Sequence, residues 1–243
     1  MCDPGSPQQN HLLASLPGPT YGELVPHLEP VSLPHGWVVH EPDRRLEYVY
    51  FPITSIVSLV YIMENGASAE IAIAGNEGLV GIMSVLSGGI TPNWAVVETA
   101  GRAYRMKGES LKRIFTRDGA LQHALLRYAQ ALMTQTAQIS VCNRHHSVEH
   151  QLCRWLLMHL DRLTGDELFI TQEQIAHMLG VRREGITEAA GKLQSDGIIH
   201  YRRGRIAIVD RPQLESRTCE CYGVMKKEYN RLLIYPASRK SSA

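Results

Sequence analysis

The pattern of hydrophobic and polar positions changes twice along the chain. Between residues 31 and 106, short β-prone runs alternate with turn residues. Residues 118–144 contain no proline, and their apolar positions recur three and four apart. After residue 147, shorter helical periods lead into two β runs. This order predicts an antiparallel β-domain, one long helix and a mainly helical C-terminal domain, which is an α+β fold.

The first region predicts a closed antiparallel sandwich or barrel, because many brief strands follow one another at turn spacing. The expected strands are residues 37–39, 48–51, 53–62, 69–74, 79–82, 95–99 and 102–106. Asn65-Gly66 is the strongest hairpin signal, since both residues tolerate positive φ. Before this region, Thr20 could cap a short helix that reaches Leu28. Residues 1–19 are rich in Pro, Gly, Ser and Gln and predict a loose tail.

The second region predicts a single helix about 40 Å long. Seven of its positions alternate four and three apart, as in a coiled-coil seam with one polar member: Leu121, Leu125, Tyr128, Leu132, Gln135, Ile139 and Cys142. We interpret this seam as the interface with a second copy of the chain. Leu126, Ala129 and Met133 widen the apolar stripe toward the β-domain. The alternative is a core helix without any partner.

Residues 171–205 predict two short helices, a tight turn and a small hairpin. Thr171 and Gln174 form a capping-box pattern, and Gly180 can end the first helix in a left-handed conformation. The second helix begins near Arg182. Its expected buried side is Ile186, Ala189, Ala190 and Leu193, and its outward side is Arg182, Arg183, Glu184, Thr187 and Glu188. Two β runs then flank the basic turn at residues 202–205.

This layout is typical of a winged helix-turn-helix, whose second helix enters the major groove. The chain as a whole has a net charge of +1, yet residues 182–205 hold six Lys/Arg and three Asp/Glu. Positive charge is therefore concentrated where phosphate contacts would lie. The alternatives are a helical hairpin with a solvated basic face, and a helix-turn-helix that serves protein contacts.

Length and composition add limits. With 243 residues, 44% of them hydrophobic, the chain can form one large or two modest domains. We divide it into a tail (1–19), a β-roll (20–116), a dimerisation helix (117–145), the winged helix-turn-helix (146–212) and a C-terminal helical extension with a tail (213–243). The chain has five cysteines without the spacing of a disulfide framework, and it shows neither a signal-peptide pattern nor an apolar run of membrane length. We therefore predict a cytoplasmic protein without a membrane partner.

Other chemistry is weakly indicated. Cys142, His146, His150 and Cys153 would share a face for a metal or redox site only if the helix continued through residues 143–146, which we interpret as a hinge. Cys219 and Cys221 are two apart on an expected helix, so their thiols should point apart. A cupin-type enzyme needs a His-x-His pair in the β-domain, where only His35 and His40 occur. We therefore predict no enzyme, no cofactor and no metal site.

The order of β-roll, long helix, hinge and winged helix resembles the Crp/Fnr family of bacterial transcription regulators. The most specific motifs are Ile170-Thr171-Gln172-Glu173-Gln174-Ile175-Ala176, leading through Leu179-Gly180 to Arg183-Glu184, and Tyr48-Val49-Tyr50-Phe51-Pro52 in the β-domain. The resemblance implies a cytoplasmic homodimer that binds palindromic double-stranded promoter DNA. It also implies RNA polymerase as a partner and an effector in the β-roll that moves the long helices.

Residue roles follow from the resemblance position by position. Arg183 and Glu184 are expected to contact bases, with Arg182, Thr187 and Glu188 beside them. The expected phosphate contacts are Thr171, Gln172, Lys192, Arg202, Arg203 and Arg205. The chain departs from the cyclic-AMP branch at Glu188, where that branch has a second arginine, and at Arg182, where a small capping residue is common. The preferred DNA sequence therefore does not transfer.

The effector site also departs from the cyclic-nucleotide branch. There a Gly-Glu pair holds the ribose and an Arg-Ser-Ala run holds the phosphate. The matching pocket positions are Gly81, Ile82, Asn93 and Trp94, which offer no cation to a buried phosphate. We predict an unknown or lost effector rather than cyclic AMP. Cys2 alone cannot supply the N-terminal cysteine cluster of the iron–sulfur branch. The alternative function is a metal-binding or redox-sensing β-roll whose helix-turn-helix binds protein.

Overall fold

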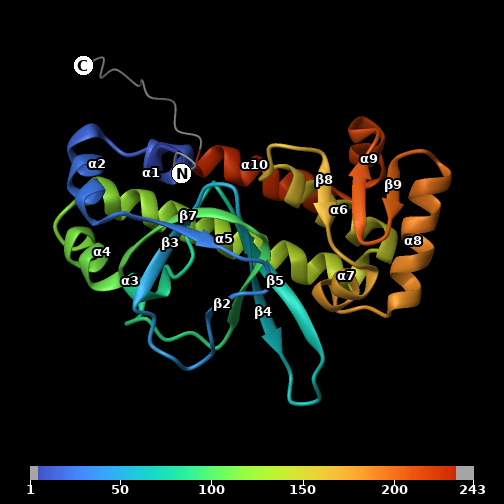
Figure 1. The fold of residues 1–243 in the computed structure, drawn as a ribbon, viewed down its shortest axis with the longest axis horizontal. Helices are drawn as coiled ribbons and strands as arrows, with labels where there is room; N and C mark the ends of the chain where they lie inside the picture. The colour runs from blue at the N-terminus through green and yellow to red at the C-terminus, as the bar shows by residue number, and fades with distance from the viewer. Residues whose placement is uncertain (1–4, 234–243) are drawn as a thin grey trace.

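The computed structural model describes residues 5–233 and confirms the α+β class. Helix α5 (Gly119–His145) runs along the long axis of the molecule (Figure 1). The β-domain packs on one part of α5, and the C-terminal helices gather at its other end, where α8 (Arg183–Ser195) forms the outer edge. Asp118 caps α5 by accepting a hydrogen bond from the Leu121 backbone N–H at 2.9 Å.

The β-domain consists of two antiparallel sheets. The first, in spatial order, is β1 (Glu29–Leu33), β7 (Gly101–Lys107) and β3 (Tyr48–Pro52). The second is β2 (Val38–His40), β6 (Trp94–Thr99), β4 (Ile56–Ile62) and β5 (Ser68–Ala74). The hairpin predicted at Asn65-Gly66 joins β4 to β5, and Gly66 has a φ of 83°. Short helices α3 (Met83–Leu86) and α4 (Gly108–Phe115) complete the domain.

One strand prediction was wrong, and one strand was not predicted. Residues 79–82 form only an isolated bridge between Val80 and Tyr50, because Gly81 has a φ of 94° and turns the chain into α3. The sequence analysis also missed β1, which contains Pro30. This strand lies at a sheet edge and pairs only with β7, and an edge strand is where a residue without an N–H is tolerated.

The loose tail expected at residues 1–19 was wrong for residues 5–19. They form η1 (Pro7–Gln9), α1 (His11–Ala14) and the start of α2 (Gly18–Leu24), which is followed by η2 (Val25–His27). The Asn10 side chain is fully buried and donates to the carbonyls of Pro52 (2.9 Å) and Gly78 (2.8 Å). Thr20 lies inside α2 and does not cap it. Residues 1–4 lie outside the described part.

The seam assigned to the dimer interface faces the protein's own interior. Six of its members, Leu121, Leu125, Tyr128, Gln135, Ile139 and Cys142, are buried within the single chain. Tyr128 donates its hydroxyl to the Leu79 carbonyl at 2.8 Å, and Gln135 accepts from the Ile73 N–H at 2.7 Å. The assignment of these residues to a dimer contact is therefore wrong. The large exposed apolar residues of α5 are Leu126, Met133 and Val141.

The C-terminal region is a three-helix unit with a small sheet. Its elements are α6 (Val148–Leu160), β8 (Glu167–Phe169), α7 (Gln172–Leu179), α8, β9 (Ile199–Arg202) and β10 (Arg205–Ile208). The predicted last helix is two helices, α9 (Arg211–Arg217) and α10 (Glu220–Leu233), and α10 packs along α5 (Figure 1). The tail expected after it, residues 234–243, lies outside the described part. No helix in the described range is long and apolar enough to cross a membrane.

Candidate DNA-binding surface and interdomain sites

The helix-turn-helix is built by local signals that the sequence analysis identified. Thr171 and Gln174 form the complete capping box at the start of α7. Gly180 has a φ of 66° and closes α7 in the left-handed conformation, which a residue with a Cβ adopts only at a cost. The Tyr201 hydroxyl on β9 accepts from the Gln172 backbone N–H at 3.1 Å. The wing is thereby attached to the first helix of the pair.

The predicted base-contacting residues lie together at the exposed start of α8. Arg182 is the N-cap residue, and its side chain makes no capping hydrogen bond. Arg183, Glu184, Thr187 and Glu188 are exposed, whereas Ile186, Ala189, Ala190 and Leu193 are buried as predicted. Thr187 donates to Gln172 Oε1 at 2.7 Å, so the two helices are also joined on their outer side.

The wing places two arginines at its tip. Arg203 and Gly204 have φ values of 50° and 76°, as in a two-residue type I′ turn between β9 and β10. Arg202 and Arg203 are exposed. Arg205 differs, because its Nε donates to Glu167 Oε2 at 2.9 Å across the sheet and its guanidinium lies 5.5 Å from the Phe169 ring centroid. Its charge is already paired within the wing.

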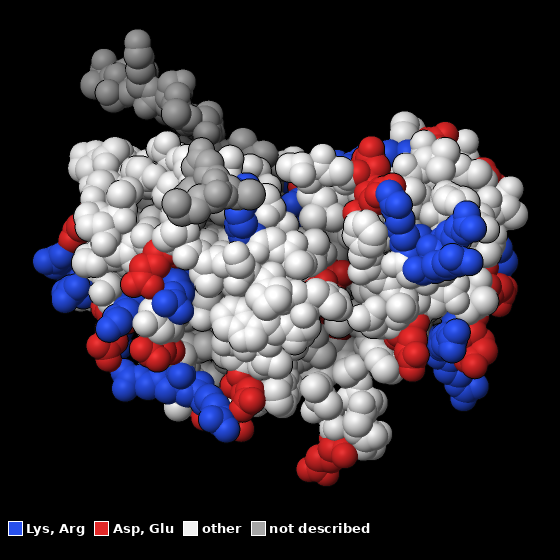
Figure 2. Space-filling view, in the orientation of Figure 1, with Lys and Arg blue, Asp and Glu red and all other residues white. Residues whose placement is uncertain are grey.

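Charge is unevenly distributed over this end of the molecule, where Lys and Arg gather around α8 and the wing (Figure 2). Arg182, Arg183, Arg202 and Arg203 have no ion pair within the described residues. Lys192 lies 2.8 Å from Glu188 one turn earlier. Their hydrogen bond lowers the pKa of Glu188 and raises the pKa of Lys192. The unpaired positive charge is therefore concentrated on the four arginines.

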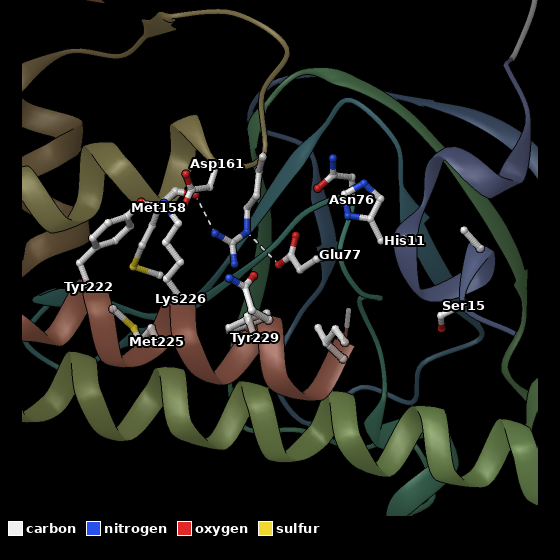
Figure 3. A pocket seen from close by; sticks show the side chains of 14 residues that line it. His11, Ser15, Asn76, Glu77, Met158, Asp161, Tyr222, Met225, Lys226 and Tyr229 are labelled. Atoms are coloured by element: carbon white, nitrogen blue, oxygen red, sulfur yellow. Dashed lines mark hydrogen bonds and ion pairs between the residues drawn. The ribbon is translucent and has the colours of Figure 1, made fainter. Parts of the chain in front are cut away.

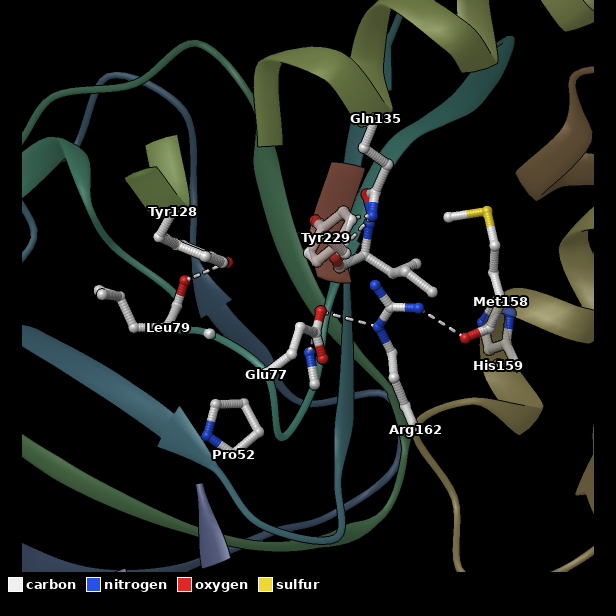
Figure 4. A network of polar contacts seen from close by, with 12 residues as sticks. Pro52, Glu77, Leu79, Tyr128, Gln135, Met158, His159, Arg162 and Tyr229 are labelled. Carbon is white, nitrogen blue, oxygen red and sulfur yellow. Dashed lines mark hydrogen bonds and ion pairs between the residues drawn. The ribbon is translucent and has the colours of Figure 1, made fainter. Parts of the chain in front are cut away.

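A buried polar network joins the β-domain to the C-terminal unit (Figure 4). Arg162, after α6, lies 2.8 Å from Glu77, and the two side chains are 8% and 12% exposed. Its Nη1 also donates to the Met158 carbonyl at 2.6 Å. Gln135 of α5 donates to Tyr229 of α10 at 3.1 Å and to the Ile73 carbonyl at 3.3 Å. A movement of one domain against the other would break these contacts.

A second buried group lies at the same interface. His159 Nε2 of α6 is 2.9 Å from Glu98 Oε2 of β6, and both side chains are almost fully buried. Burial acts to lower the pKa of His159, but the charges of Glu98 and Glu70 outweigh it and raise that pKa. Glu70 accepts from the Ser58 hydroxyl at 2.6 Å, and burial raises the pKa of Glu70. The C-terminal unit is thus held against the β-domain by titratable contacts.

A cavity of about 550 Å³ opens beside this network (Figure 3). Its walls come from α1, the end of α6 and α10, and they include His11, Asp161, Arg162, Lys226 and Tyr229. It is a space between domains that the sequence analysis did not predict, because its lining residues are far apart in the chain.

The predicted effector positions do not line that cavity. Ile82 and Asn93 are buried, with 5% and 8% exposure. The Asn93 amide is occupied, since its Nδ2 donates to the Trp94 carbonyl at 3.0 Å and its Oδ1 accepts from Thr91. A second cavity of about 320 Å³ lies nearby, lined by Arg45, Lys107 and Lys112 among others, and it too includes none of the four predicted residues.

Four potential metal ligands meet beside the hinge: Cys142, His146, Cys219 and Cys221. Their donor atoms all lie within 4.8 Å of one another. The prediction that the two C-terminal thiols point apart was wrong, because Cys219 precedes α10 and does not follow its helical periodicity. A hydrogen bond from the Cys142 thiol lowers the pKa of Cys219 to about 5. Burial raises the pKa of Cys221 to about 11.

Two family models match the chain. The model described as a cyclic nucleotide-binding domain matches residues 30–118, and the model described as a Crp-like helix-turn-helix domain matches residues 150–217. The first covers the β-domain, and the second covers α6, the helix-turn-helix and the wing.

Curated relatives are similar over most of the chain. The Global nitrogen regulator of Synechococcus elongatus is 22% identical over 210 residues, which are 82% of this chain and 93% of that protein. The CRP-like cAMP-activated global transcriptional regulator of Mycobacterium tuberculosis is 23% identical over 201 residues, which are 80% of this chain and 90% of that protein.

Solved structures share the fold. A transcriptional regulator of the Crp/Fnr family from Eubacterium rectale has a TM-score of 0.65 at 17% identity, with 86% of this chain and 98% of that chain covered. FixK2 from Bradyrhizobium japonicum has a TM-score of 0.66 at 16% identity, with 79% and 98% covered.

Proposed function

Because the chain belongs to the Crp/Fnr family of transcription regulators, we propose that it binds promoter DNA sequence-specifically as a homodimer. In this proposal it acts in the cytoplasm, and its effect on transcription is exerted through RNA polymerase. The observation that carries the proposal is the exposed start of α8 beside the wing, where four arginines have no ion pair in the described chain.

The arginines divide into two groups by position. Arg182 and Arg183 lie at the N-terminal end of the helix that enters the major groove, where a guanidinium can pair with guanine O6 and N7. Arg202 and Arg203 lie on the wing, where they would contact the flanking phosphates. Arg205 and Lys192 contribute less in this proposal, because each already has a carboxylate partner.

The proposed dimer uses the outer face of α5 rather than the buried seam. Leu126, Met133 and Val141 are 51%, 73% and 49% exposed, and they are seven and eight residues apart. That spacing is close to the heptad repeat of a two-helix contact, so the three side chains lie along one side of the helix. A two-fold pair of α5 helices would present two copies of α8 to half-sites one helical turn apart.

We also propose that the β-domain does not respond to cyclic AMP. The two positions that match the phosphate-holding run, the buried Asn93 and the half-buried Trp94, carry no positive charge, and the Asn93 amide is already hydrogen bonded within the chain. A phosphate buried there would lack a charged partner. Any effector would act by altering the contacts of Glu77 with Arg162 and of Gln135 with Tyr229. Calorimetric titration with cyclic AMP tests this, and micromolar binding would refute it.

The test of the main proposal compares Arg183→Ala with Arg45→Ala. Arg45 is 73% exposed in its side chain, lies in the loop between β2 and β3, and provides a control that removes the same charge far from α8. A duplex selected from random sequence serves as the specific site, and a scrambled duplex serves as the non-specific one. Arg183→Ala should weaken specific binding by about 1–3 kcal/mol and non-specific binding much less. Arg45→Ala should change neither.

Equal losses for Arg183→Ala on both duplexes would show that Arg183 contacts only phosphate. Failure to select any duplex at low ionic strength would refute sequence-specific DNA binding, since phosphate contacts are strongest there.

A further inference from the structure

The three thiols and one imidazole at the hinge have the composition of a metal site. Cys142 lies in the last turn of α5, and His146 is the C-cap residue whose backbone N–H donates to the Cys142 carbonyl, so the two residues are neighbours at the end of the helix. Cys219 and Cys221 flank the first residue of α10. Thiolate and imidazole donors suit zinc and other thiophilic metals rather than magnesium or calcium.

The distances fit one metal ion. Cys142 Sγ lies 3.5 Å from Cys219 Sγ, and Cys221 Sγ lies 3.6 Å from His146 Nδ1. In a tetrahedral zinc site, bond lengths of about 2.3 Å to sulfur and about 2.0 Å to nitrogen place the ligand atoms about 3.5–3.8 Å apart. Two of the six donor pairs therefore already have the separation of such a site, and all four donor atoms lie within 4.8 Å of one another. A 4Fe–4S cluster binds each of its four ligands to a separate iron and therefore needs a wider arrangement.

The surroundings of His146 match those of a metal-bound histidine. Its Nδ1 faces Cys221, whereas its Nε2 lies 3.4 Å from Glu220 Oε2. A carboxylate on the far nitrogen is the usual outer partner of a ligating histidine, because it fixes the tautomer and raises the basicity of the ligand. The His146 carbonyl also accepts from Gln151 Nε2 at 2.9 Å, which holds this turn in place.

Charge balance supports the same conclusion. One divalent ion with three thiolates and a neutral imidazole carries a net charge of −1. Arg154 of α6 is 1% exposed, and its contact with Asn143 places it beside Cys142, the preceding residue of α5. Its side-chain hydrogen bonds go to Met158 Sδ and Asn143 Oδ1, and it has no carboxylate partner among the residues described. The charge of Arg154 acts on the buried Glu70 without a direct ion pair, and an anionic metal site beside this guanidinium would lower the cost of burying it.

We propose that Cys142, His146, Cys219 and Cys221 bind one thiophilic divalent metal ion, with Zn²⁺ as the best fit. The ion fastens the N-terminal end of α10 to the C-terminal end of α5, next to the break at His146–Ser147 between α5 and α6. Binding of the ion releases thiol protons and involves no oxidation or reduction.

The test uses the full-length protein, reduced and stripped with a chelator under anaerobic conditions. One equivalent of Co²⁺ should give the visible bands of a tetrahedral complex and near-ultraviolet thiolate charge transfer, and Zn²⁺ should abolish both. Cys221→Ser should lose the charge-transfer band in part and bind Zn²⁺ at least tenfold more weakly. Cys153→Ala is the matched control, because that thiol is equally buried but lies outside the cluster. It should bind Co²⁺ as the unmodified protein does.

Glu220→Gln changes an exposed residue that does not ligate, so it keeps the fold and should weaken Zn²⁺ binding about 10–100-fold. The unmodified protein alone can overturn the proposal, if Co²⁺ produces no thiolate charge transfer or if Cys142 and Cys219 form a disulfide that excludes metal in reducing buffer. Equal loss of binding in Cys153→Ala and Cys221→Ser would also overturn it. None of these readouts involves DNA, so they are independent of the proposed function.

Discussion

The ion pair of Glu77 with Arg162 offers the sharpest test of how the two domains are held together. Glu77→Gln keeps the shape and one carbonyl acceptor but removes the negative charge. The Arg162 side chain, 8% exposed, would then keep its positive charge in the interface without a carboxylate in contact. Its hydrogen-bond acceptors would be the Met158 carbonyl and the new amide oxygen. Removal of one member of a buried pair costs about 3–5 kcal/mol, and the retained acceptor favours the lower end, about 3 kcal/mol.

The free energy of unfolding is measured by urea denaturation at one fixed protein concentration, because self-association raises apparent stability. For a chain of this size, a loss of about 3 kcal/mol lowers the melting temperature by about 6–12 °C. The double variant Glu77→Gln/Arg162→Met should recover most of the loss, since it leaves no unpaired charge in the interface.

Glu109→Gln is the matched control. Glu109 pairs with Arg45 at 3.5 Å, and their side chains are 85% and 73% exposed, so solvent screens the pair and no measurable change is expected. If Glu77→Gln and Glu109→Gln behaved alike, the buried pair would not stabilise the interface. The single variants Glu77→Gln and Arg162→Met should each lower the free energy of unfolding. If the double variant lost as much as the sum of these two losses, the argument that the two charges are paired would be refuted.

Three further predictions concern association, the wing and pH. Met133→Glu should shift the sedimentation of the protein from dimer to monomer. Met63→Glu, at a 63% exposed position of the hairpin tip, should not. If Met133→Glu still sedimented as a dimer, the outer face of α5 would be excluded as the dimer interface. Arg203→Gly should raise the free energy of unfolding by about 1 kcal/mol, because glycine adopts the φ of 50° without strain. It should also weaken binding to any duplex, because it removes a phosphate contact. A lower free energy of unfolding would contradict the type I′ turn. The pKa of His159 is raised above 6.5 in the folded protein, so its contribution to stability is complete below pH 6.5 and is lost as pH rises through the folded pKa. The urea midpoint should therefore fall above pH 6.5, and Glu98→Gln should flatten that slope; a midpoint that rises with pH would refute this assignment.

Local sequence signals predicted the helix-turn-helix unit correctly. The capping box at Thr171, the left-handed Gly180 and the buried face of α8 all depend on residues within a few positions of one another. The hairpin at Asn65-Gly66 and the start of α5 at Asp118 are of the same kind. In each case the backbone conformation and its hydrogen bonds are satisfied inside a single element or turn.

Predictions failed where they required knowing which distant part of the chain, or which partner, buries a given face of an element. The periodicity of α5 showed an apolar stripe, but both a partner helix and the protein's own β-domain can bury such a stripe. Tyr128 and Gln135 are instead covered by Leu79, Ile73 and Tyr229. Composition likewise predicted a loose N-terminus, because it could not show that Asn10 would satisfy two buried carbonyls of distant segments.

The sequence alone determined the order of the elements, the helix-turn-helix with its wing, and the family resemblance. These follow from short-range backbone preferences, caps and turns, whose energetics involve near neighbours in the chain. Only the tertiary structure decided which side of α5 is free, and that Cys142 and His146 meet Cys219 and Cys221. Those outcomes depend on the packing of α10 along α5, which brings together residues more than seventy positions apart.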